Sequence, residues 1–184
     1  MALLRDQGEK AMLTRYSSFM TVENTLSEVV QMLLKNDRLK RLLYYTDRKA
    51  LELPKLTPAQ SLSLIGNQIR IVPKLNVEYQ ASPYVILTMD NFVPNDNMTA
   101  FRSCTLGVDI IVPYEHWNLE NFKLRPYAIA GEIDAMLNKS NQTHLGIADF
   151  GGAKMLLVNS EVGGLTLYYN IEAFTSDVKL NPEE

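Results

Sequence analysis

A chain of 184 residues can bury roughly 70% of its unfolded surface in one domain, so it needs no disulfide or metal to hold a core. Its 46% hydrophobic and 21% charged residues are typical of a globular domain and argue against a disordered or membrane-spanning chain. A net charge of -3 argues against general affinity for nucleic acid, which requires a basic surface.

Apolar positions at helical spacing predict a helix in the N-terminal half, from Thr21 to Tyr45, with an interruption at Asn36-Asp37. Thr25 and Glu28 match the capping-box pattern, so we expect them at the start of this helix. The second part of the helix is basic but interleaved with acids, and we expect its cations to lie on a solvated face. These cations are Lys35, Arg38, Lys40, Arg41, Arg48 and Lys49.

A connector with two prolines follows, over residues 47–66. Thr57-Pro58 can open a short helix inside it, because a proline at the first helical position gives up no hydrogen bond that the helix needs. We expect that helix to end near Gly66.

Five strand-like runs follow, at residues 68–72, 84–90, 102–112, 154–159 and 165–171. Alternation puts Val85, Leu87 and Met89 on one face of the second run, as expected of a strand with a core side. The last two runs form a hairpin, and we place its turn at residues 160–164, which end in two glycines. Cys104, the single cysteine, lies in the third run as a small buried hydrophobe.

A second main helix begins at Arg125-Pro126 and continues to Leu137. The order of helix, three strands, helix and two strands predicts an α+β domain, in which two main helices pack on a mixed or antiparallel sheet of about five strands. We treat residues 1–184 as a single domain, residues 1–20 as an N-terminal arm and residues 177–184 as a frayed end.

The sequence carries no pattern that is typical of catalysis or metal binding. Asp149-Phe150-Gly151 matches a kinase tripeptide without the other kinase motifs, and we interpret it as a strand end before a glycine turn. Glu132 and Asp134 stand two apart on a helix and point to opposite sides, which leaves Glu132 on an exposed flank, solvated or contacting another subunit. Neither His116 nor His144 has a second ligand at a metal-binding spacing. We therefore expect no catalytic residue, no metal and no cofactor.

Parts of the chain resemble the small tail terminator and neck proteins of tailed bacteriophages. The resemblance lies in Phe101-Arg102, in Val108-Asp109-Ile110-Ile111-Val112, in Trp117, and in Arg125-Pro126-Tyr127-Ala128-Ile129-Ala130-Gly131-Glu132-Ile133-Asp134. The element order is similar from about Val22 to Phe174. The connector is longer than a minimal terminator needs, which leaves open an added contact with a neck or sheath subunit.

The resemblance implies a virion protein without enzymatic activity. Such a protein forms a hexameric ring at the head-proximal end of the tail tube, stops tube growth and joins the tail to the head. Its partners would be copies of itself, the tail tube protein, the head connector or neck proteins, and in some tails the sheath. DNA would pass in transit without sequence-specific binding, and no membrane is involved.

A closed ring needs contacts that sheet edges or long loops can supply without any catalytic group. We expect these contacts in the loops at residues 91–98 and 113–122, the second with three exposed aromatic rings. Trp117 is either an interface anchor or part of a small satellite core. The candidate contact residues are Asn91, Phe92, Asn95, Tyr114, Trp117, Phe122, Arg125 and Glu132.

Other functions remain open at this stage. The chain could be another structural protein of a virion, such as a head completion or tail-tube-like protein, which ring formation would distinguish. It could be a binding module with no viral connection, which genomic neighbourhood would decide. It could also be a small metal-dependent hydrolase or nuclease that uses Asp90, Asp96 or Asp109, which cleavage of DNA would reveal.

Overall fold

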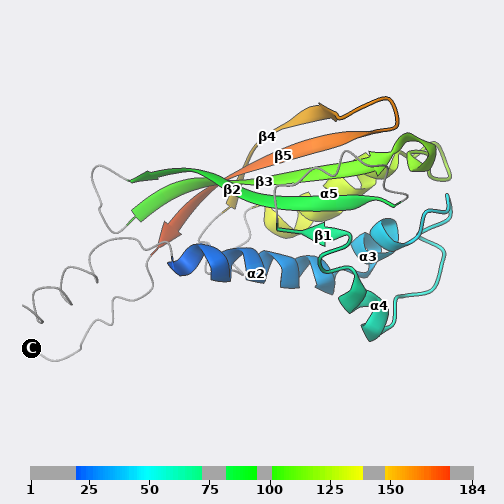
Figure 1. The fold of residues 1–184 in the computed structure, drawn as a ribbon, viewed down its shortest axis with the longest axis horizontal. Helices are drawn as coiled ribbons and strands as arrows, with labels where there is room; N and C mark the ends of the chain where they lie inside the picture. Colours follow the sequence, from blue (N-terminus) through cyan, green and yellow to red (C-terminus); the bar gives the residue numbers. More distant parts are fainter. Residues whose placement is uncertain (1–19, 72–81, 95–100, 139–147, 175–184) are drawn as a thin grey trace, which may run out of the picture.

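The computed structural model describes residues 20–71, 82–94, 101–138 and 148–174. They form a single α+β domain of two layers, a five-stranded sheet and a layer of helices on one of its faces (Figure 1). The sheet has the strand order β1-β2-β3-β5-β4 and is mixed, because β1 pairs with β2 in parallel and all other pairs are antiparallel. The predicted fold class is confirmed.

The helices agree with the sequence pattern except at one start. Asn36 interrupts the long N-terminal helix and caps the second part, because its side-chain oxygen accepts hydrogen bonds from the N–H groups of Arg38 and Leu39. Thr57 caps the short helix in a capping box. The predicted box at Thr25 is wrong, since that helix already begins at Met20 and Thr25 is buried inside it. The helices are α2 (Met20–Lys35), α3 (Asp37–Tyr44), α4 (Pro58–Ser63), the 3-10 turn η1 (Tyr114–His116) and α5 (Arg125–Leu137).

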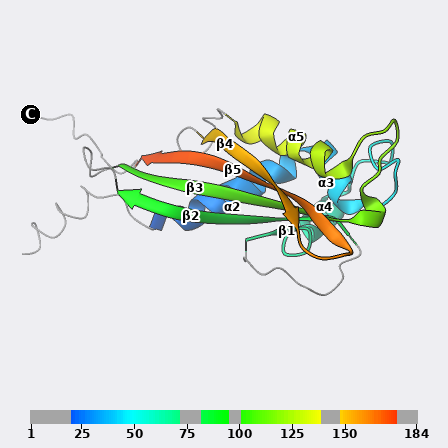
Figure 2. The same ribbon diagram turned by 90° about the horizontal axis from the view of Figure 1, so that it is seen from above.

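The five predicted strands are all present and in the expected order. They are β1 (Ile69–Arg70), β2 (Tyr84–Pro94), β3 (Phe101–Pro113), β4 (Ala148–Leu157) and β5 (Val162–Phe174). β3 lies at the centre and pairs along its whole length with β5, from Phe101 opposite Phe174 to Pro113 opposite Val162. Figure 2 shows β2, β3 and β5 as long ribbons that span most of the domain.

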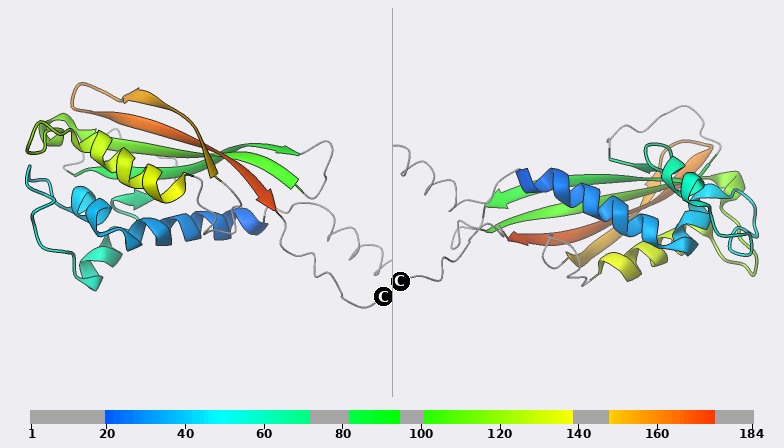
Figure 3. Two further views of the ribbon diagram at one scale, coloured as in Figure 1. Left: turned by 180° about the vertical axis from the view of Figure 1, so that it is seen from behind. Right: turned by 90° about the horizontal axis from the view of Figure 1, so that it is seen from below.

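The core lies between the sheet and the helices α2, α3 and α5, which lie below the sheet in the left view of Figure 3. Alternate residues of the strands face it, including Val85 and Leu87 of β2 as predicted. Cys104 is buried there with 5% of its surface exposed. Four residues on the opposite face form a second, smaller cluster, namely Tyr84, Ile86, Ile111 and Val162.

The glycine pair of the hairpin lies in strand β5, so the predicted turn is wrong. The turn is built on Asn159, whose side chain accepts hydrogen bonds from the N–H groups of Glu161 and Val162. Gly163 and Gly164 pair with residues of both β3 and β4. A Cβ atom on Gly164 would lie 1.8 Å from the carbonyl oxygen of Ile110, so β3 and β5 approach too closely for a side chain there.

Strand β4 begins at Ala148, earlier than the sequence pattern indicated. Asp149-Phe150-Gly151 lies inside this strand, where the register with β5 shifts between Phe150 and Gly152. Gly152 has a φ of +143°, a conformation that favours glycine. The predicted strand end is therefore a β-bulge, and its local irregularity hid the start of β4 from the alternation pattern.

Several sequence predictions fall outside the described residues. They concern most of the N-terminal arm, the C-terminal end at 177–184, Asn95, Asp96 and His144. Among the helices that the structure describes, none has the length and apolar character that crossing a membrane would require.

Candidate functional site

Arg125, the first residue of α5, is the anchor of one end of the domain. Its side chain is fully buried, and all five of its N–H groups point at backbone carbonyl oxygens. The acceptors are the carbonyl groups of His116, Leu42, Tyr45, Thr46 and Asp47, at distances of 2.6 to 3.0 Å. Burial lowers the pKa of Arg125 to about 10, with Asp47 acting in the other direction, so the guanidinium stays charged at neutral pH.

The connector between α3 and α4 is held by further side chains that bond to its backbone. Arg41 donates to the carbonyl groups of Leu51 and Leu53, and the Tyr45 hydroxyl donates to the carbonyl of Pro54 at 3.1 Å. Lys55 reaches Asp37 at the start of α3, at 2.8 Å. Hydrogen bonds from Lys40 and Lys55 lower the pKa of Asp37 to about 2. These contacts fix a segment that has no regular secondary structure.

The segment from Tyr114 to Leu124, named the aromatic loop below, packs beside the connector. Trp117 is half-buried, and its Nε1–H donates to the carbonyl of Val112 at 2.9 Å. Its ring lies 5.1 Å from that of Tyr114, which is also half-buried. The prediction of three exposed aromatic rings is therefore wrong for these two, and Trp117 packs against the main core rather than forming a satellite core.

Phe122 is the exception, because its side chain is fully exposed at the tip of the aromatic loop. A small hairpin holds the tip, with a bridge between Asn118 and Leu124 and a hydrogen bond from the N–H of Leu119 to the carbonyl of Lys123. Phe122 has a φ of 59°, which is uncommon for a bulky residue and signals strain. Here a strained backbone displays an aromatic ring to water.

A pocket of about 150 Å³ lies between the connector and the aromatic loop. Its lining has charges of both signs, and Lys49 is 3.3 Å from Glu120 across it. This ion pair raises the pKa of Lys49. The lining residues are Arg48, Lys49, Leu51, Glu52, Leu119, Glu120, Asn121 and Lys123. The mixed charge suits a contact with a polar protein surface better than the binding of one anion.

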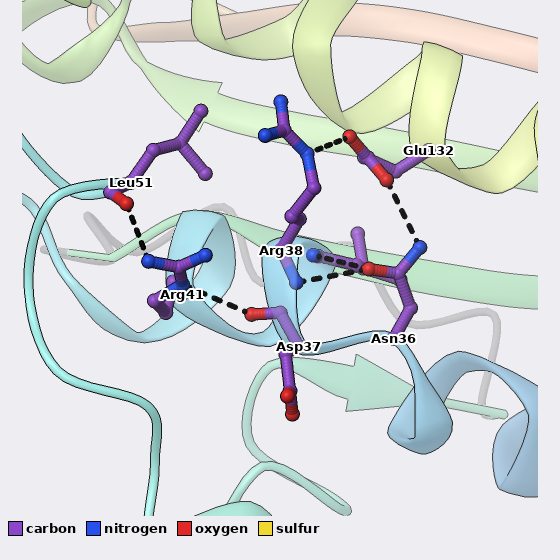
Figure 4. Close-up of polar contacts among 7 residues, drawn as sticks. Asn36, Asp37, Arg38, Arg41, Leu51 and Glu132 are labelled. Atoms are coloured by element: carbon purple, nitrogen blue, oxygen red, sulfur yellow. Dashed lines mark hydrogen bonds and ion pairs between the residues drawn. The ribbon is translucent and has the colours of Figure 1, made fainter.

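Glu132 of α5 faces the start of α3 (Figure 4). Its two oxygens accept from Arg38 Nε at 2.6 Å and from Asn36 Nδ2 at 3.0 Å. Burial acts to raise the pKa of Glu132, but the bonds from Arg38 and Asn36 outweigh it and leave the pKa below its usual value. Asp134 points elsewhere, as predicted, and accepts a hydrogen bond from Tyr169 of β5.

The predicted solvated basic face is wrong for Lys40, which is buried, and for Arg41, which is half-buried, whereas the other four cations are exposed as predicted. Arg38 pairs with Glu132, Lys40 with Asp37, and Lys49 with Glu120. Arg41 is used to bind the connector backbone. The cations of α3 hold the domain together because acids and carbonyl groups from the connector, the aromatic loop and α5 surround them.

Next to Glu132, a groove runs between α2 and α5. Its volume is about 360 Å³, and it is lined by Met32, Lys35, Asn36, Ala135 and Met136. Two methionines contribute apolar side chains to its lining, and Asn36, also in the lining, donates a hydrogen bond to Glu132. We call it the methionine groove.

The other predicted contact residues lie near the far end of β2. Asn91 is exposed with a φ of 53°, at a bulge where the register with β3 shifts. Phe92 is half-buried and packs against the main core. This end is thus separate from the aromatic loop, and Phe92 serves the core.

Within residues 20–71, 82–94, 101–138 and 148–174, no group of three His, Cys, Asp or Glu side chains could hold an ion. Asp109 lies on the face opposite the core, as its parity predicted, and accepts a hydrogen bond of 2.6 Å from Thr166.

Comparison with known proteins adds one finding. The sequence model of the YomW family matches residues 36–171, which is more than half of the chain. The chain belongs to the YomW family. No curated protein matches it.

The YomW match begins at Asn36, the cap of α3, and ends near the end of β5. It includes the connector, Arg125, the aromatic loop and the sheet, but not α2. One wall of the methionine groove therefore lies within the YomW region, and the other, with Met32, precedes it.

Two features of this YomW protein could not be predicted from its sequence, namely the internal role of Arg125 and the methionine groove. Arg125 was chosen as a contact residue, yet its donors are all used inside the domain. The Arg-Pro pair at a helix start was the visible signal, but the carbonyl groups it serves lie 78 to 83 residues away for four of its bonds. The methionine groove had no local signal, because its walls come from distant helices.

Proposed function

We propose that the chain is a structural protein of a phage particle that assembles into a ring, as tail terminators do. Such a ring would cap the tail tube with one surface and meet the neck or head connector with the other. Copies of the chain, the tube protein and the neck proteins would be its partners, and it would act without catalysis. The YomW name is of a prophage type, and the element order is similar to that of tail terminators.

The observation that carries this proposal is Phe122. A fully exposed phenylalanine on a strained but well-anchored loop leaves its apolar surface in water in the single chain. Aromatic residues dominate binding hot spots because they bury a large, rigid apolar surface. Leu124 and Tyr127 beside it are also exposed, at 36% and 51% of their surface. Together they offer an apolar contact for another protein subunit.

The test is the mass of the purified protein across a concentration series, by sedimentation velocity and native mass spectrometry, with negative-stain imaging of large species. We expect closed six-fold rings at high concentration. Phe122→Ala should weaken assembly by about tenfold or more, as truncation of a hot-spot residue does. The stability of the single chain should be unchanged, because the phenyl ring of Phe122 contacts only water there.

Leu62→Ala is the matched control, since Leu62 is 65% exposed on α4 and lies outside the aromatic loop. It should assemble like the unaltered protein. Monomers at every concentration, for the unaltered chain and both variants alike, would count against the ring. Open tubes would instead favour a tube-like protein.

A further inference from the structure

The second half of β4 is an open edge of the sheet. β4 pairs with β5 on one side, and among the described residues it has no strand on the other. The N–H of Phe150 shows which backbone groups face outward, because it donates to the Asn138 side chain and not to β5. This orientation recurs at every second residue of an antiparallel pair, and β5 carries the alternation past the bulge. The N–H and C=O groups of Ala153, Met155 and Leu157 therefore point away from the sheet.

The same three residues carry an apolar stripe on the core side of β4. Ala153 and Met155 lie opposite Leu167 and Leu165, which face the main core. Met155 and Leu157 are nevertheless 52% and 75% exposed, so the described helices leave this part of the stripe uncovered. The left view of Figure 3 shows the end of β4 at the top of the molecule, away from the helices. A bare backbone edge and a bare apolar stripe thus coincide.

Helix α5 borders this stripe with an exposed ring. Tyr127 and Asp134 are seven residues apart and therefore lie on one side of α5. That side faces the edge of the sheet, because Asp134 accepts a hydrogen bond from Tyr169, whose ring packs edge-on against that of Phe150 in β4. α5 begins at the end of the sheet where β4 turns into β5, since η1 is hydrogen-bonded to both. The exposed ring of Tyr127 therefore lies toward the open end of β4.

We infer that a second copy of the chain pairs with this edge, β4 against β4, about a two-fold axis. The straight part of β4, residues 153–157, lies between the bulge and the turn. It pairs over its whole length only in the register that places Met155 opposite Met155 of the second copy and Ala153 opposite Leu157. The two five-stranded sheets then form one continuous sheet. This contact goes beyond the proposed ring and does not depend on it.

Charge favours the same register. An axis through Lys154 would place two lysines directly opposite each other in a non-hydrogen-bonded pair, where side chains are closest and like charges repel. An axis through Met155 places Lys154 opposite Leu156 instead. The apolar stripes of the two copies then meet on one face of the joined sheet, and the lysines lie apart on the other.

The helices explain why the occupant is a second copy and not an unrelated strand. α5 packs over β3 and β5, so two strands of β4 would separate the two α5 helices. At about 4.8 Å per strand the helices would lie about 14 Å apart, more than the 8–10 Å of direct helix packing. Tyr127, Met155 and Leu157 of both copies border this space and can fill it. A lone foreign strand would bring no second helix and would leave these side chains half open.

The contact is small for a specific interface. Five residues and one tyrosine on each side stay below the roughly 800 Å² per partner of a standard complex. We therefore expect a dimer that forms at high protein concentration and dissociates on dilution.

Disulfide formation between cysteine variants reads the register. Met155→Cys puts two thiols opposite each other on Cα atoms about 5.5 Å apart, a distance that a disulfide spans. Leu157→Cys is the matched control, because Leu157 is the more exposed residue but lies opposite Ala153. Under mild oxidation Met155→Cys should form covalent dimers at least about tenfold faster, since pairing raises the effective thiol concentration. The native Cys104 is buried and leaves the background low.

Two further experiments make the result specific. A mixture of Ala153→Cys and Leu157→Cys should give mixed dimers, while each variant alone should give few. Met155→Lys places two charges opposite each other and should abolish dimerisation in sedimentation. Leu62→Lys adds the same charge at an exposed position of α4 and should leave dimerisation unchanged. Thermal unfolding of each variant checks that the fold is retained.

The remaining outcomes overturn the inference. Faster linkage through Leu157→Cys would mean that collisions or another register govern the reaction. Dimers that survive Met155→Lys would place the contact elsewhere. Absence of linkage would mean that the edge stays open or takes a strand of another protein. Rings without linkage would refute this contact and leave the ring function intact, whereas linkage without rings would support this contact and count against the ring.

Discussion

The sheet and the connector end of the domain satisfy their backbone hydrogen-bonding groups in different ways. In the sheet, β3 bonds to β2 and β5 along its length, so the side chains on the core face can be apolar. The segment between α3 and α4 has no such ladder, and side chains supply the donors instead. Arg125 donates to the carbonyl groups of Tyr45, Thr46 and Asp47, and Arg41 donates to those of Leu51 and Leu53. An irregular segment can thus be held in place when long cationic side chains supply the hydrogen-bond donors that neighbouring strands supply in a sheet.

The largest effect expected from this difference is that of Arg125→Met, which keeps the size of the side chain and removes every donor. Five carbonyl groups would lose a partner, and the free energy of unfolding should fall by about 4 kcal/mol. Hydrogen exchange should show lost protection in residues 45–57 before the sheet is affected. Arg125→Lys is the control for charge, and it should rescue little because lysine has three donors where five are needed.

If Arg125→Met lowered protection equally in β3 and in the connector, the two regions would form one cooperative unit rather than two that are held independently. Retained protection in the sheet supports it.

Gly164→Ala tests how closely the strands of the sheet must pack. Its Cβ would meet the backbone oxygen of Ile110, which cannot move without opening the ladder between β3 and β5. We expect a loss of about 2 kcal/mol, the usual cost of overpacking. Gly131→Ala is the matched control, because a Cβ on Gly131 meets nothing within 4 Å and should stabilise α5 slightly. Chemical denaturation measures the free energy of unfolding of both variants. An unchanged value for Gly164→Ala would show that β3 and β5 can move apart at no cost.

The smallest effect concerns Glu132, which joins α5 to the start of α3. Its folded-state pKa lies below the usual 4.5, so its contribution to stability is present above that pH and is lost as the pH falls through the folded-state pKa. Arg38 is 56% exposed in this pair, so solvent screening limits the contribution to about 0.5 kcal/mol.

Glu132→Gln keeps the shape and removes the charge. The difference in unfolding free energy from the unaltered protein should be present at pH 7 and should shrink below pH 4.5, as urea titrations at several pH values can measure. A difference that stays constant down to pH 3 would show that the charge of Glu132 plays no part.

Much of the fold could be predicted, because helices and strands with one buried face carry a period that the sequence displays. The break at Asn36, the short helix opened by Thr57-Pro58 and the strand faces of Val85 and Leu87 all followed from local patterns. The predictions failed where distant segments decide the outcome. Gly164 looked like a turn residue, yet it is required by the approach of β3, more than fifty positions earlier in the chain.

In the candidate site, too, local patterns were predictable and contacts between distant segments were not. Phe122 was named from its loop and its residue type, but the pattern could not separate it from Tyr114 and Trp117, which pack inward. That separation depends on the carbonyl of Val112 and on neighbouring side chains, which the spacing of aromatic residues does not reveal. The contact roles of Phe122 and Glu132 stay predictions until assembly is measured.

The bulge in β4 limits how a second chain could pair with this edge of the sheet. β4 lies at an edge of the sheet, where an open strand can recruit a foreign strand and start aggregation. Here the Asn138 side chain accepts the N–H of Phe150, and the bulge that follows bends the strand, so an added strand could align only with its second half. This edge therefore offers an added strand fewer backbone partners than a straight edge of the same length would.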